Sequence, residues 1–551
     1  MSGIVQAAMP NLIVVPVLLP MLCAGVMILL GEHWRPLKLV LGTISTVLGV
    51  LIAVALLRWV NVNGPATYLV GNWPVPFGIA LAVDRLSALM LVITWILGGA
   101  ALLFGSSRWH RAGVHFPALF QLELMGLSGA FLTADIFNLF VFFEILLAAS
   151  YGLLLHGSGE SRVRASVRYV AVNILASSIF LIGVSTIYGV TGTLDMAELA
   201  ARLSKPGVPS RHLVDAGAAL LAIAFLIKAA AWPLNFWLVP AYRAATPPAA
   251  AIFAVLTKVG VYSLVRLWNL MFAGGPLAGF GADGLLVFGL GTAILAAFGM
   301  LASHRLAAQV AWGVVISAGT LVAALGTRAE MVLGGAIFYL LPSTVAAGAA
   351  FLLADLIDRW EAGTTIVEEA PFLNAKLEDT SDVNLDDEEA PLVGRPIPAS
   401  AALLGFAFLA CALLIAGFPP LPTFIGKAAM VSAAIAPATQ GQGSGARGAI
   451  FATVILGCGL VALIALSRTG IRIFWSGGRR QPPVVRAAEA VPVVGLLALC
   501  GLLTVAAGPT MSLAHAAARS LRDRRDYIDA VLRANVSASP TTPKALRETP
   551  R

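Results

Sequence analysis

The sequence predicts an all-α, polytopic membrane protein with about fourteen transmembrane helices, including two inverted five-helix repeats that each contain a broken helix. Three observations support this fold class. Of the 551 residues, 59% are hydrophobic and only 12% are charged, which is far outside the range of soluble globular proteins. Apolar runs of roughly twenty residues, long enough to cross a bilayer, recur along the chain. Prolines interrupt two of these runs.

The predicted spans are separated by short breaks that contain polar residues, proline or glycine. They begin near Asn11, Leu37, Ala80, Pro117, Ile136, Val167, Leu213, Ala249, Ala282, Ala307, Leu333, Ala401, Ala449 and Val491. The first run is too long for a signal peptide and no charged region precedes it, so we expect a retained helix.

Lysine and arginine are distributed unevenly among the loops, and this distribution predicts the orientation. The first, third and fifth loops contain GEHWRPLK, SSRWHRAG and SGESRVRASVR, whereas the second, VNVNGPATYLVGNWPVPFG, has no charge. The pattern places the N-terminus on the outer side of the membrane, and the basic tail RSLRDRRDYIDAVLR is an exception to it. We attribute the net charge of +8 to topology and expect no nucleic-acid binding.

The runs and loops divide the chain into four parts. Residues 1–110 hold the first three helices, 111–272 the first repeat, 280–476 the second repeat, and 477–551 the last helix and the basic tail. An acidic cytoplasmic loop, 355–398, contains IVEEAPFLNAKLEDTSDVNLDDEEA. Such a block is typical of a solvated insertion, and a docking surface for a basic partner is the alternative.

Motifs for cofactor chemistry are missing from the sequence. It contains no glycine-rich phosphate loop, no HExxH and no haem-attachment motif, so we expect no redox cofactor and no nucleotide hydrolysis. The four cysteines have no CxxC spacing and are expected to be buried small side chains. No span shows an oxygen-rich cluster that would indicate a Na⁺ or K⁺ site. The energy for any transport would then come from an ion gradient or from partner subunits.

Four ionisable residues lie inside apolar runs. They are Glu144 in FNLFVFFEILLAAS, Lys228 in LAIAFLIKAAAWP, Lys258 in FAVLTKVGVYSLV and Lys427 in PTFIGKAAMVSAA. Helix rise places Glu144 about 12 Å and Lys258 about 15 Å into a hydrocarbon core about 30 Å thick. A charge at such depth costs about 2.5 to 3.5 kcal/mol, so each requires a partner or water. A single structural ion pair is the alternative, but it would leave two lysines unexplained.

Prolines predict a helix break beside two of these lysines. Pro233 follows Lys228 by five residues and leaves a backbone carbonyl without its helical partner. Pro419 and Pro420 shortly precede Lys427. Broken helices persist at membrane depth only where protein or water covers the freed backbone. At matching positions in two halves of a chain, they are typical of transporters with a mid-membrane ion path.

A buried lysine and a carboxylate can together transfer protons. The carboxylate favours the charged form of the lysine, so moving one partner changes the proton affinity of the other. Moving one charge across 100 mV changes its free energy by about 2.3 kcal/mol. The change in the proton affinity of a buried lysine can be of the same size. We therefore expect Glu144, Lys228, Lys258 and Lys427 to pass protons along the membrane plane.

Other polar residues have structural alternatives. Glu123 lies in an apolar run and is either a second relay carboxylate or a group that faces a partner subunit. Asp135 either caps the next helix or acts in transport. His304 is expected in a cytoplasmic loop and Asp84 at the start of its span. Arg266 is expected to reach an interface by snorkelling.

Four segments resemble the antiporter-like family, which comprises Mrp-type cation/proton antiporters and the proton-pumping membrane subunits of respiratory complex I. They are TADIFNLFVFFEIL, IKAAAWPLNFWLVPAY, VLTKVGVYSLVR and PPLPTFIGK, and the resemblance covers residues 75–475. Within the family, the length, VDRLSALML at 83–91 and AFLLADLIDRW before the acidic loop are most similar to the D-type subunit of the Mrp complex, which is also called Mnh or Pha.

The resemblance implies a role for each buried charge. Glu144 would form an ion pair that controls the proton affinity of Lys228. Lys258 would be the next site of the relay, and Lys427 its terminal lysine. The chain would then be the proton-translocating subunit of a multisubunit Na⁺/H⁺ or K⁺/H⁺ antiporter, a secondary transporter that assembles with other hydrophobic subunits.

Two positions depart from the family pattern. Pro342 stands where many members of the family have a histidine, and Asn235 stands where some have one. Water ordered by Tyr339, Ser343 and Thr344 could replace a titratable group between Lys258 and Lys427, and poor conduction through the second half is the alternative. Two other functions stay open: a proton-pumping subunit of a complex I-like or membrane-bound hydrogenase complex, and a structural subunit with a decayed relay.

Overall fold

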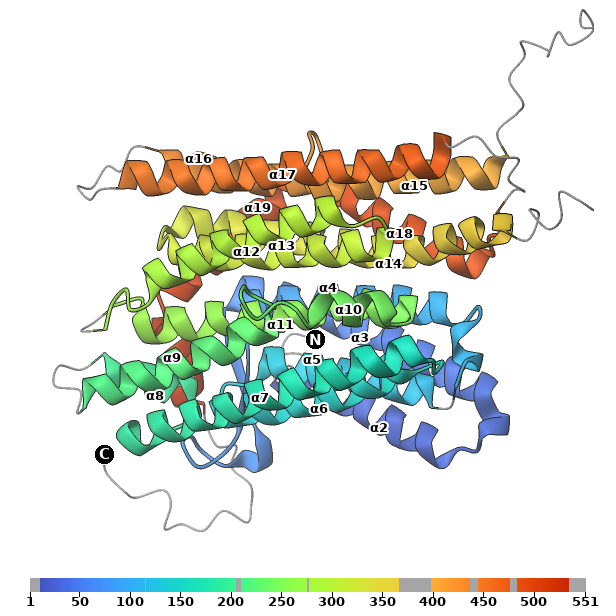
Figure 1. Ribbon diagram of the computed structural model, residues 1–551. Coiled ribbons are helices and arrows are strands. Elements are labelled where there is room, and N and C mark those ends of the chain that lie inside the picture. The colour runs from blue at the N-terminus through green and yellow to red at the C-terminus, as the bar shows by residue number, and fades with distance from the viewer. Residues whose placement is uncertain are drawn as a thin grey trace, which may run out of the picture.

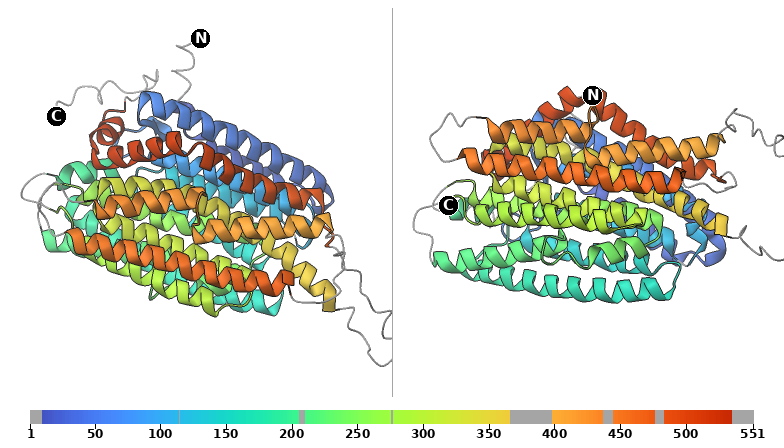
Figure 2. Two further views of the ribbon diagram at one scale, coloured as in Figure 1. Left: turned by 90° about the horizontal axis from the view of Figure 1, so that it is seen from above. Right: turned by 45° about the horizontal axis from the view of Figure 1, so that its top comes forward.

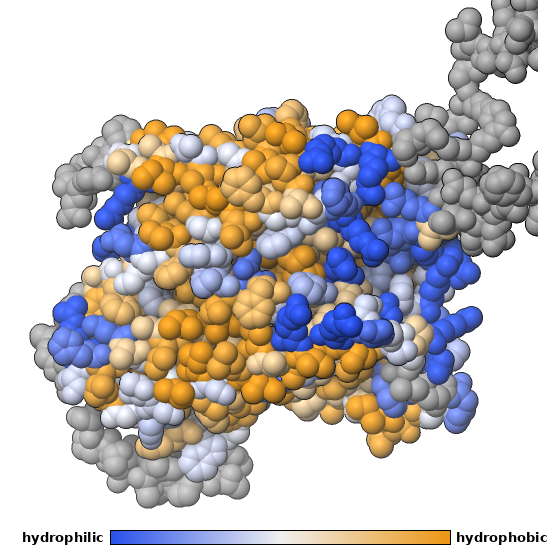
Figure 3. Space-filling view, viewed as in Figure 1, coloured by the Kyte–Doolittle hydropathy of each residue, from blue (hydrophilic) through white to orange (hydrophobic). Residues whose placement is uncertain are grey.

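The computed structural model describes residues 10–113, 115–204, 210–274, 277–365, 398–436, 444–475 and 483–534. They form a bundle of long, roughly parallel helices, seen from three directions in Figures 1 and 2. In the described part, eleven helices are long and apolar enough to cross a membrane, and three more apolar helices are shorter. Apolar side chains cover most of the face in Figure 3, and many hydrophilic ones gather toward the ends of the helices.

The helices correspond to the predicted spans, and the all-α membrane class is confirmed. The helices at the predicted spans are α2 (Val15–Leu29), α3 (Arg35–Asn63), α4 (Arg85–Gly105), α5 (Phe116–Leu132), α6 (Ile136–Leu155), α7 (Glu160–Thr191), α9 (Arg211–Lys228), α11 (Pro247–Phe272), α12 (Ala282–Ala302), α13 (Leu306–Gly326), α14 (Glu330–Thr365), α15 (Ala399–Ala416), α16 (Pro422–Ile435), α17 (Ser444–Trp475) and α18 (Ala487–Val505). The other helices are α8 (Met196–Leu203), α10 (Leu238–Ala244), α19 (Ala507–Arg522), α20 (Arg525–Leu532) and the 3₁₀ turns η1 (Glu32–Trp34), η2 (Val70–Asn72) and η3 (Trp109–Arg111).

Two spans are broken at the positions where prolines predicted a helix break. The connection between α9 and α10 contains Pro233, and that between α15 and α16 contains Pro419. The Trp237 indole N–H donates to the carbonyl oxygen of Ile227 at 3.1 Å, so a side chain covers backbone freed by the first break. If each broken pair, α9–α10 and α15–α16, is taken as one span, α5 to α11 and α12 to α17 are two successive sets of five spans. The break lies in the fourth span of each set. The domain boundaries drawn from the sequence stay predictions.

A short antiparallel hairpin joins α3 to α4. It consists of β1 (Ala66–Leu69) and β2 (Ala80–Val83), with Ala66 opposite Val83. The predicted start of the third span near Ala80 is therefore wrong, since the helix begins at Arg85. The reason is a helix cap: the Asp84 carboxylate accepts a hydrogen bond from the Ser87 backbone N–H at 2.9 Å, which ends the strand and starts the helix.

The predicted acidic loop begins later than residue 355. α14 continues past Pro342 to Thr365, so residues 355–365 are helical. The remainder of that loop, 366–397, lies outside the described residues.

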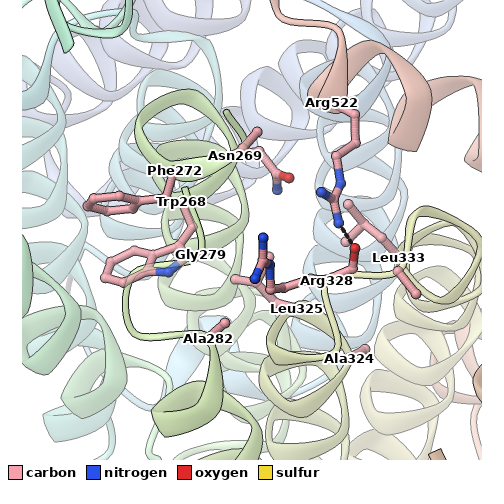
Figure 4. A pocket seen from close by; sticks show the side chains of 12 residues that line it. Trp268, Asn269, Phe272, Gly279, Ala282, Ala324, Leu325, Arg328, Leu333 and Arg522 are labelled. Atoms are coloured by element: carbon pink, nitrogen blue, oxygen red, sulfur yellow. Dashed lines mark hydrogen bonds between the residues drawn. The ribbon is translucent and has the colours of Figure 1, made fainter. Parts of the chain in front are cut away.

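The basic C-terminal segment packs on the bundle as two short helices. α19 packs against α4, α11 and α14, and α20 against α8 and β1. Arg522 donates a hydrogen bond to the backbone carbonyl of Arg328, and Figure 4 shows this bond in close-up. Arg524 donates to the carbonyl of Leu270 at the end of α11. Two arginines of this segment thus bind carbonyls where helices end or connect.

Candidate functional site

The carboxylate of Glu144 points from α6 toward α7. Its Oε1 accepts a hydrogen bond from the Ser177 hydroxyl of α7. Lys228 at the end of α9 interacts with Glu144 electrostatically, but their charged atoms form no ion pair within 4.0 Å in the described structure. The ion pair implied by the family resemblance is thus replaced here by a bond between Glu144 and Ser177.

The ammonium group of Lys228 lies against an aromatic ring instead. Its Nζ is 4.8 Å from the centre of the Phe143 ring, on the residue that precedes Glu144. This Nζ is buried and has no hydrogen-bond partner among the described residues. A cation over an aromatic face is stabilised by about 2 kcal/mol when it is desolvated. The lysine is therefore held near Glu144 but stays available for a closer partner.

A hydrogen-bonded row of side chains starts at Lys258 on α11. Its Nζ donates to the Ser317 hydroxyl of α13 at 2.8 Å. Ser317 donates to the Ser343 hydroxyl of α14 at 3.1 Å, which itself donates to the Leu340 carbonyl. The phenol of Tyr339, also on α14, interacts with Ser317 as well. The row leads from Lys258 directly to the segment around Pro342.

The next lysine, Lys427, lies near the ring of Tyr339. Lys427 Nζ is 5.9 Å from the centre of the Tyr339 ring. It donates at 2.8 Å to the carbonyl of Ala416, the last residue of α15, so it caps a carbonyl that the helix break leaves free. Tyr339 thus contacts both Ser317 and Lys427.

Glycines allow the helices to approach closely beside these lysines. A Cβ at Gly260, two residues after Lys258, would lie 2.8 Å from the backbone nitrogen of Ala229, which follows Lys228. A Cβ at Gly426, next to Lys427, would lie 2.8 Å from the Cβ of Tyr339. Both distances are shorter than real Cβ contacts allow. The close approach at these glycines therefore fixes the position of Lys258 relative to the end of α9 and that of Lys427 relative to α14.

The charged and hydroxyl side chains lie on helices that pack against one another in sequence. The order is α6, α7, α9, α11, α13, α14 and α16, and every successive pair is in contact. Hydroxyl groups can donate and accept at the same time, so they can relay a proton between two amines. The arrangement is chemically suited to moving protons across the bundle from Glu144 to Lys427.

The secondary candidates take different positions. Glu123 on α5 is 0% exposed and interacts electrostatically with Tyr169 and Tyr242, so it faces the interior of this chain and not a partner. Asp135 caps α6 by accepting from the Asn138 backbone N–H at 2.7 Å. His304 lies exposed in the connection between α12 and α13, and its cytoplasmic side stays a prediction.

Thr344 and Asn235 form no hydrogen bond to the buried lysines in the described structure. The hydroxyl of Thr344 donates at 2.7 Å to the carbonyl of Leu340 in its own helix, so it is not directed toward either lysine. Asn235 is buried in the connection that contains Pro233, and its Nδ2 has no hydrogen-bond partner among the described residues.

The prediction for Arg266 is wrong. Instead of snorkelling to an interface, it is buried and forms two bonds to the Asp84 carboxylate, at 2.5 and 2.7 Å. The Tyr262 hydroxyl and the Tyr527 ring complete its surroundings. A bidentate carboxylate satisfies the guanidinium inside the protein, so the side chain has no need to reach water.

Two serines that contact the buried charges were not predicted. Ser177 is one of several serines in α7, and Ser317 is the one serine of α13. A hydroxyl is tolerated in an apolar helix because it can bond to the backbone of its own helix. Their only sequence signal is a small polar residue in an apolar run, which many structural serines share.

Within the described residues, no group of three or more His, Cys, Asp or Glu side chains could hold a metal ion. The four cysteines are free thiols there, and Cys411, Cys458 and Cys500 are buried.

Comparison with known proteins identifies the family. The family described as NADH:quinone oxidoreductase/Mrp antiporter, TM, matches residues 133–376. The D-type subunit of a probable K⁺/H⁺ antiporter from Rhizobium meliloti (strain 1021) is 46% identical over 534 residues, 95% of this chain and 98% of the relative. The chain belongs to the family of D-type Mrp antiporter subunits. The resemblance seen in the four sequence segments is thus confirmed.

Two further matches agree with this family. The D-type subunit of the Na⁺/H⁺ antiporter from Alkalihalophilus pseudofirmus (strain ATCC BAA-2126 / JCM 17055 / OF4) is 30% identical over 531 residues, 95% of this chain and all of the relative. A chain in the structure of the Mrp complex from Dietzia sp. DQ12-45-1b superposes with a TM-score of 0.79 at 25% identity, covering 96% of this chain and 99% of that one.

Proposed function

We propose that this chain is the proton-carrying subunit of a multisubunit antiporter that exchanges protons for a monovalent cation. The observation that carries the proposal is the series of buried or partly buried charges and hydroxyls from Glu144 to Lys427, on helices that pack against one another in order. The antiporter names of the D-type relatives support the same function.

The first step of the relay is a change of partner by Glu144. In this structure the carboxylate bonds to Ser177 while Lys228 lies on the Phe143 ring. Turning the carboxylate from Ser177 to Lys228 makes an ion pair and increases the proton affinity of the lysine. Turning it back releases the proton toward Lys258, whose helix touches the backbone beside Lys228 at Gly260.

The second step passes through hydroxyl groups. Lys258 is joined to Ser317 and Ser343, and the Tyr339 phenol lies between this pair and Lys427. These hydroxyls would take the place of the histidine that the family resemblance implies near Pro342. The hydrogen bonds that lead from Lys258 through Ser317 to Ser343, and the position of Lys427 beside the Tyr339 ring, argue against a decayed structural subunit.

We propose K⁺ as the exchanged cation, because the relative named for K⁺ is more similar than the relative named for Na⁺. Other hydrophobic subunits would complete the complex. The basic residues of the first, third and fifth loops and the bacterial relatives support a bacterial inner membrane with the N-terminus in the periplasm.

The test is antiport by the complete complex in everted membrane vesicles. A pH-sensitive dye reports the loss of the proton gradient when K⁺ or Na⁺ is added. We expect Glu144→Ala to abolish the K⁺ response while assembly on a native gel is unchanged. The matched control is Glu160→Ala, an exposed carboxylate at the start of α7. Full activity of Glu144→Ala would refute the relay, and co-purification of flavin or iron–sulfur proteins would favour a redox-driven pump.

A further inference from the structure

Four arginines from three separate segments surround one hollow of about 290 Å³. Its lining includes Ser161, Arg164 and Arg168 of α7, Arg243 of α10, and Arg305, which directly precedes α13. Figure 3 shows hydrophilic side chains interrupting the apolar surface near α10. The candidate proton path uses none of these arginines.

The positive charge around this hollow is only partly balanced. Arg164 pairs with Glu160 at 2.7 Å, and Arg305 interacts electrostatically with Asp358. Arg168 and Arg243 have no hydrogen bond or ion pair to any described residue. Guanidinium groups that face one hollow repel each other, and an anion between them removes that repulsion.

The arginines are held in place by a link between two elements. Arg162 of α7 donates from Nε to the carbonyl of Ala244 at 2.9 Å, which fixes the end of α10 beside the start of α7. The neighbouring residue Arg243 is thereby kept at the hollow. The first turn of α7 and the start of α13 add the partial positive charge of helix N-termini. Arginine binds phosphate groups with two parallel hydrogen bonds, so a phosphate fits these donors.

An exposed, mostly apolar strip continues from the arginines along α7. Ala171, Leu175, Ser178 and Ile182 follow Arg164 and Arg168 at intervals of three or four residues, so all lie on one side of the helix. Leu175 is 56% and Ile182 57% exposed. A free phosphate ion would make no contact with this apolar strip, whereas the acyl chains of a lipid would cover it.

We propose that the hollow binds the phosphate headgroup of an anionic phospholipid, with acyl chains along the side of α7 that contains Leu175 and Ile182. Basic pockets between transmembrane helices are known to suit acidic headgroups. The lipid would neutralise Arg168 and Arg243 and would join α7, α10 and the start of α13 through one ligand.

The test is native mass spectrometry of the intact complex in mild detergent, with added phosphatidylglycerol, cardiolipin, phosphatidylcholine or inorganic phosphate. We expect the unmodified complex to bind the two anionic lipids more tightly than phosphatidylcholine. The double variant Arg168→Gln/Arg243→Gln should bind them about tenfold more weakly. The control Arg58→Gln/Arg468→Gln removes the same charge from exposed arginines elsewhere.

A second measurement identifies the occupant directly. A photo-crosslinking residue at Leu175 should attach to phospholipid in the intact complex. Equal lipid binding by both double variants, or a crosslink to another protein subunit, would overturn the proposal. If inorganic phosphate displaced the anionic lipids and Leu175 formed no crosslink to lipid, the hollow would be a site for a phosphate ion, and the lipid proposal would be overturned.

Discussion

Lys258 donates a hydrogen bond to the Ser317 hydroxyl at 2.8 Å, and this single contact joins the lysine of α11 to the second half of the bundle. The Ser317 hydroxyl in turn donates to the hydroxyl of Ser343 at 3.1 Å, and Ser343 directly follows Pro342. Since Pro342 has no titratable group and no N–H, the neighbouring hydroxyls are the groups that can move a proton there.

Ser317→Ala should reduce antiport strongly without preventing assembly. A hydrogen bond to a charged group is worth about 1.5 to 3 kcal/mol, so its loss should slow proton passage roughly ten- to a hundredfold. Vesicle antiport and a native gel measure the two properties. The matched control is Ser263→Ala on α11, whose hydroxyl donates only to the carbonyl of Val259. An unchanged rate for Ser317→Ala would exclude this serine from the path.

Gly260→Ala should disturb the junction between α11 and the broken helix. Its Cβ would lie 2.8 Å from the Ala229 nitrogen and 2.9 Å from the Phe225 carbonyl oxygen, where only backbone could yield. Overpacking of this kind costs about 1 to 3 kcal/mol. We expect a lower melting temperature of the purified complex and slower antiport. Gly457→Ala, with open space around its Cβ, is the control and should change neither.

The spans and the two breaks could be predicted because their causes are local in the sequence. Apolar length decides membrane insertion, and Pro233 and Pro419 remove backbone donors wherever they occur. Lys258 could also be found, because a charge in an apolar run is costly unless it has a partner. These features needed no knowledge of which helices touch.

The partners of these groups could not be predicted, because they depend on tertiary packing. Ser317 meets Lys258 only because α11 packs against α13, and nothing in either helix indicates that register. Arg266 was mistaken for a snorkelling residue because its partner Asp84 lies 182 residues earlier in the chain. The hairpin before α4 was missed because four-residue strands give little periodic pattern.

Breaking the buried pair of Asp84 and Arg266 should destabilise the protein more than replacing both residues. Asp84→Asn leaves the Arg266 guanidinium buried without its counter-ion, at a cost of about 3 to 5 kcal/mol. The double variant Asp84→Asn/Arg266→Met removes both charges and should recover part of the loss. Thermal unfolding of the purified complex measures all three variants, including Arg266→Met. Additive losses in the double variant would mean that the two side chains are not coupled.

Asp195 should make stability depend on pH. This loop residue caps α8 by accepting from the backbone N–H groups of Ala197 and Glu198, at 3.0 and 2.8 Å. Burial raises its pKa from 3.8 to about 7, against the effect of the Glu198 N–H bond, and the nearby Asp135 carboxylate raises it further. The folded protein therefore keeps a proton on Asp195 that the unfolded chain loses above pH about 4.

The sign of the effect follows from this difference. Between pH about 4 and about 7 each pH unit should lower the free energy of unfolding by about 1.4 kcal/mol, and above that range the loss should level off. Asp195→Asn keeps the oxygen that caps α8 but cannot ionise. Its melting temperature should therefore fall less than that of the unmodified complex between pH 5 and pH 8. Asp526→Asn, an exposed carboxylate on α20, is the control and should keep the original slope. Equal slopes for all three proteins would show that Asp195 is ionised in the folded state across this range.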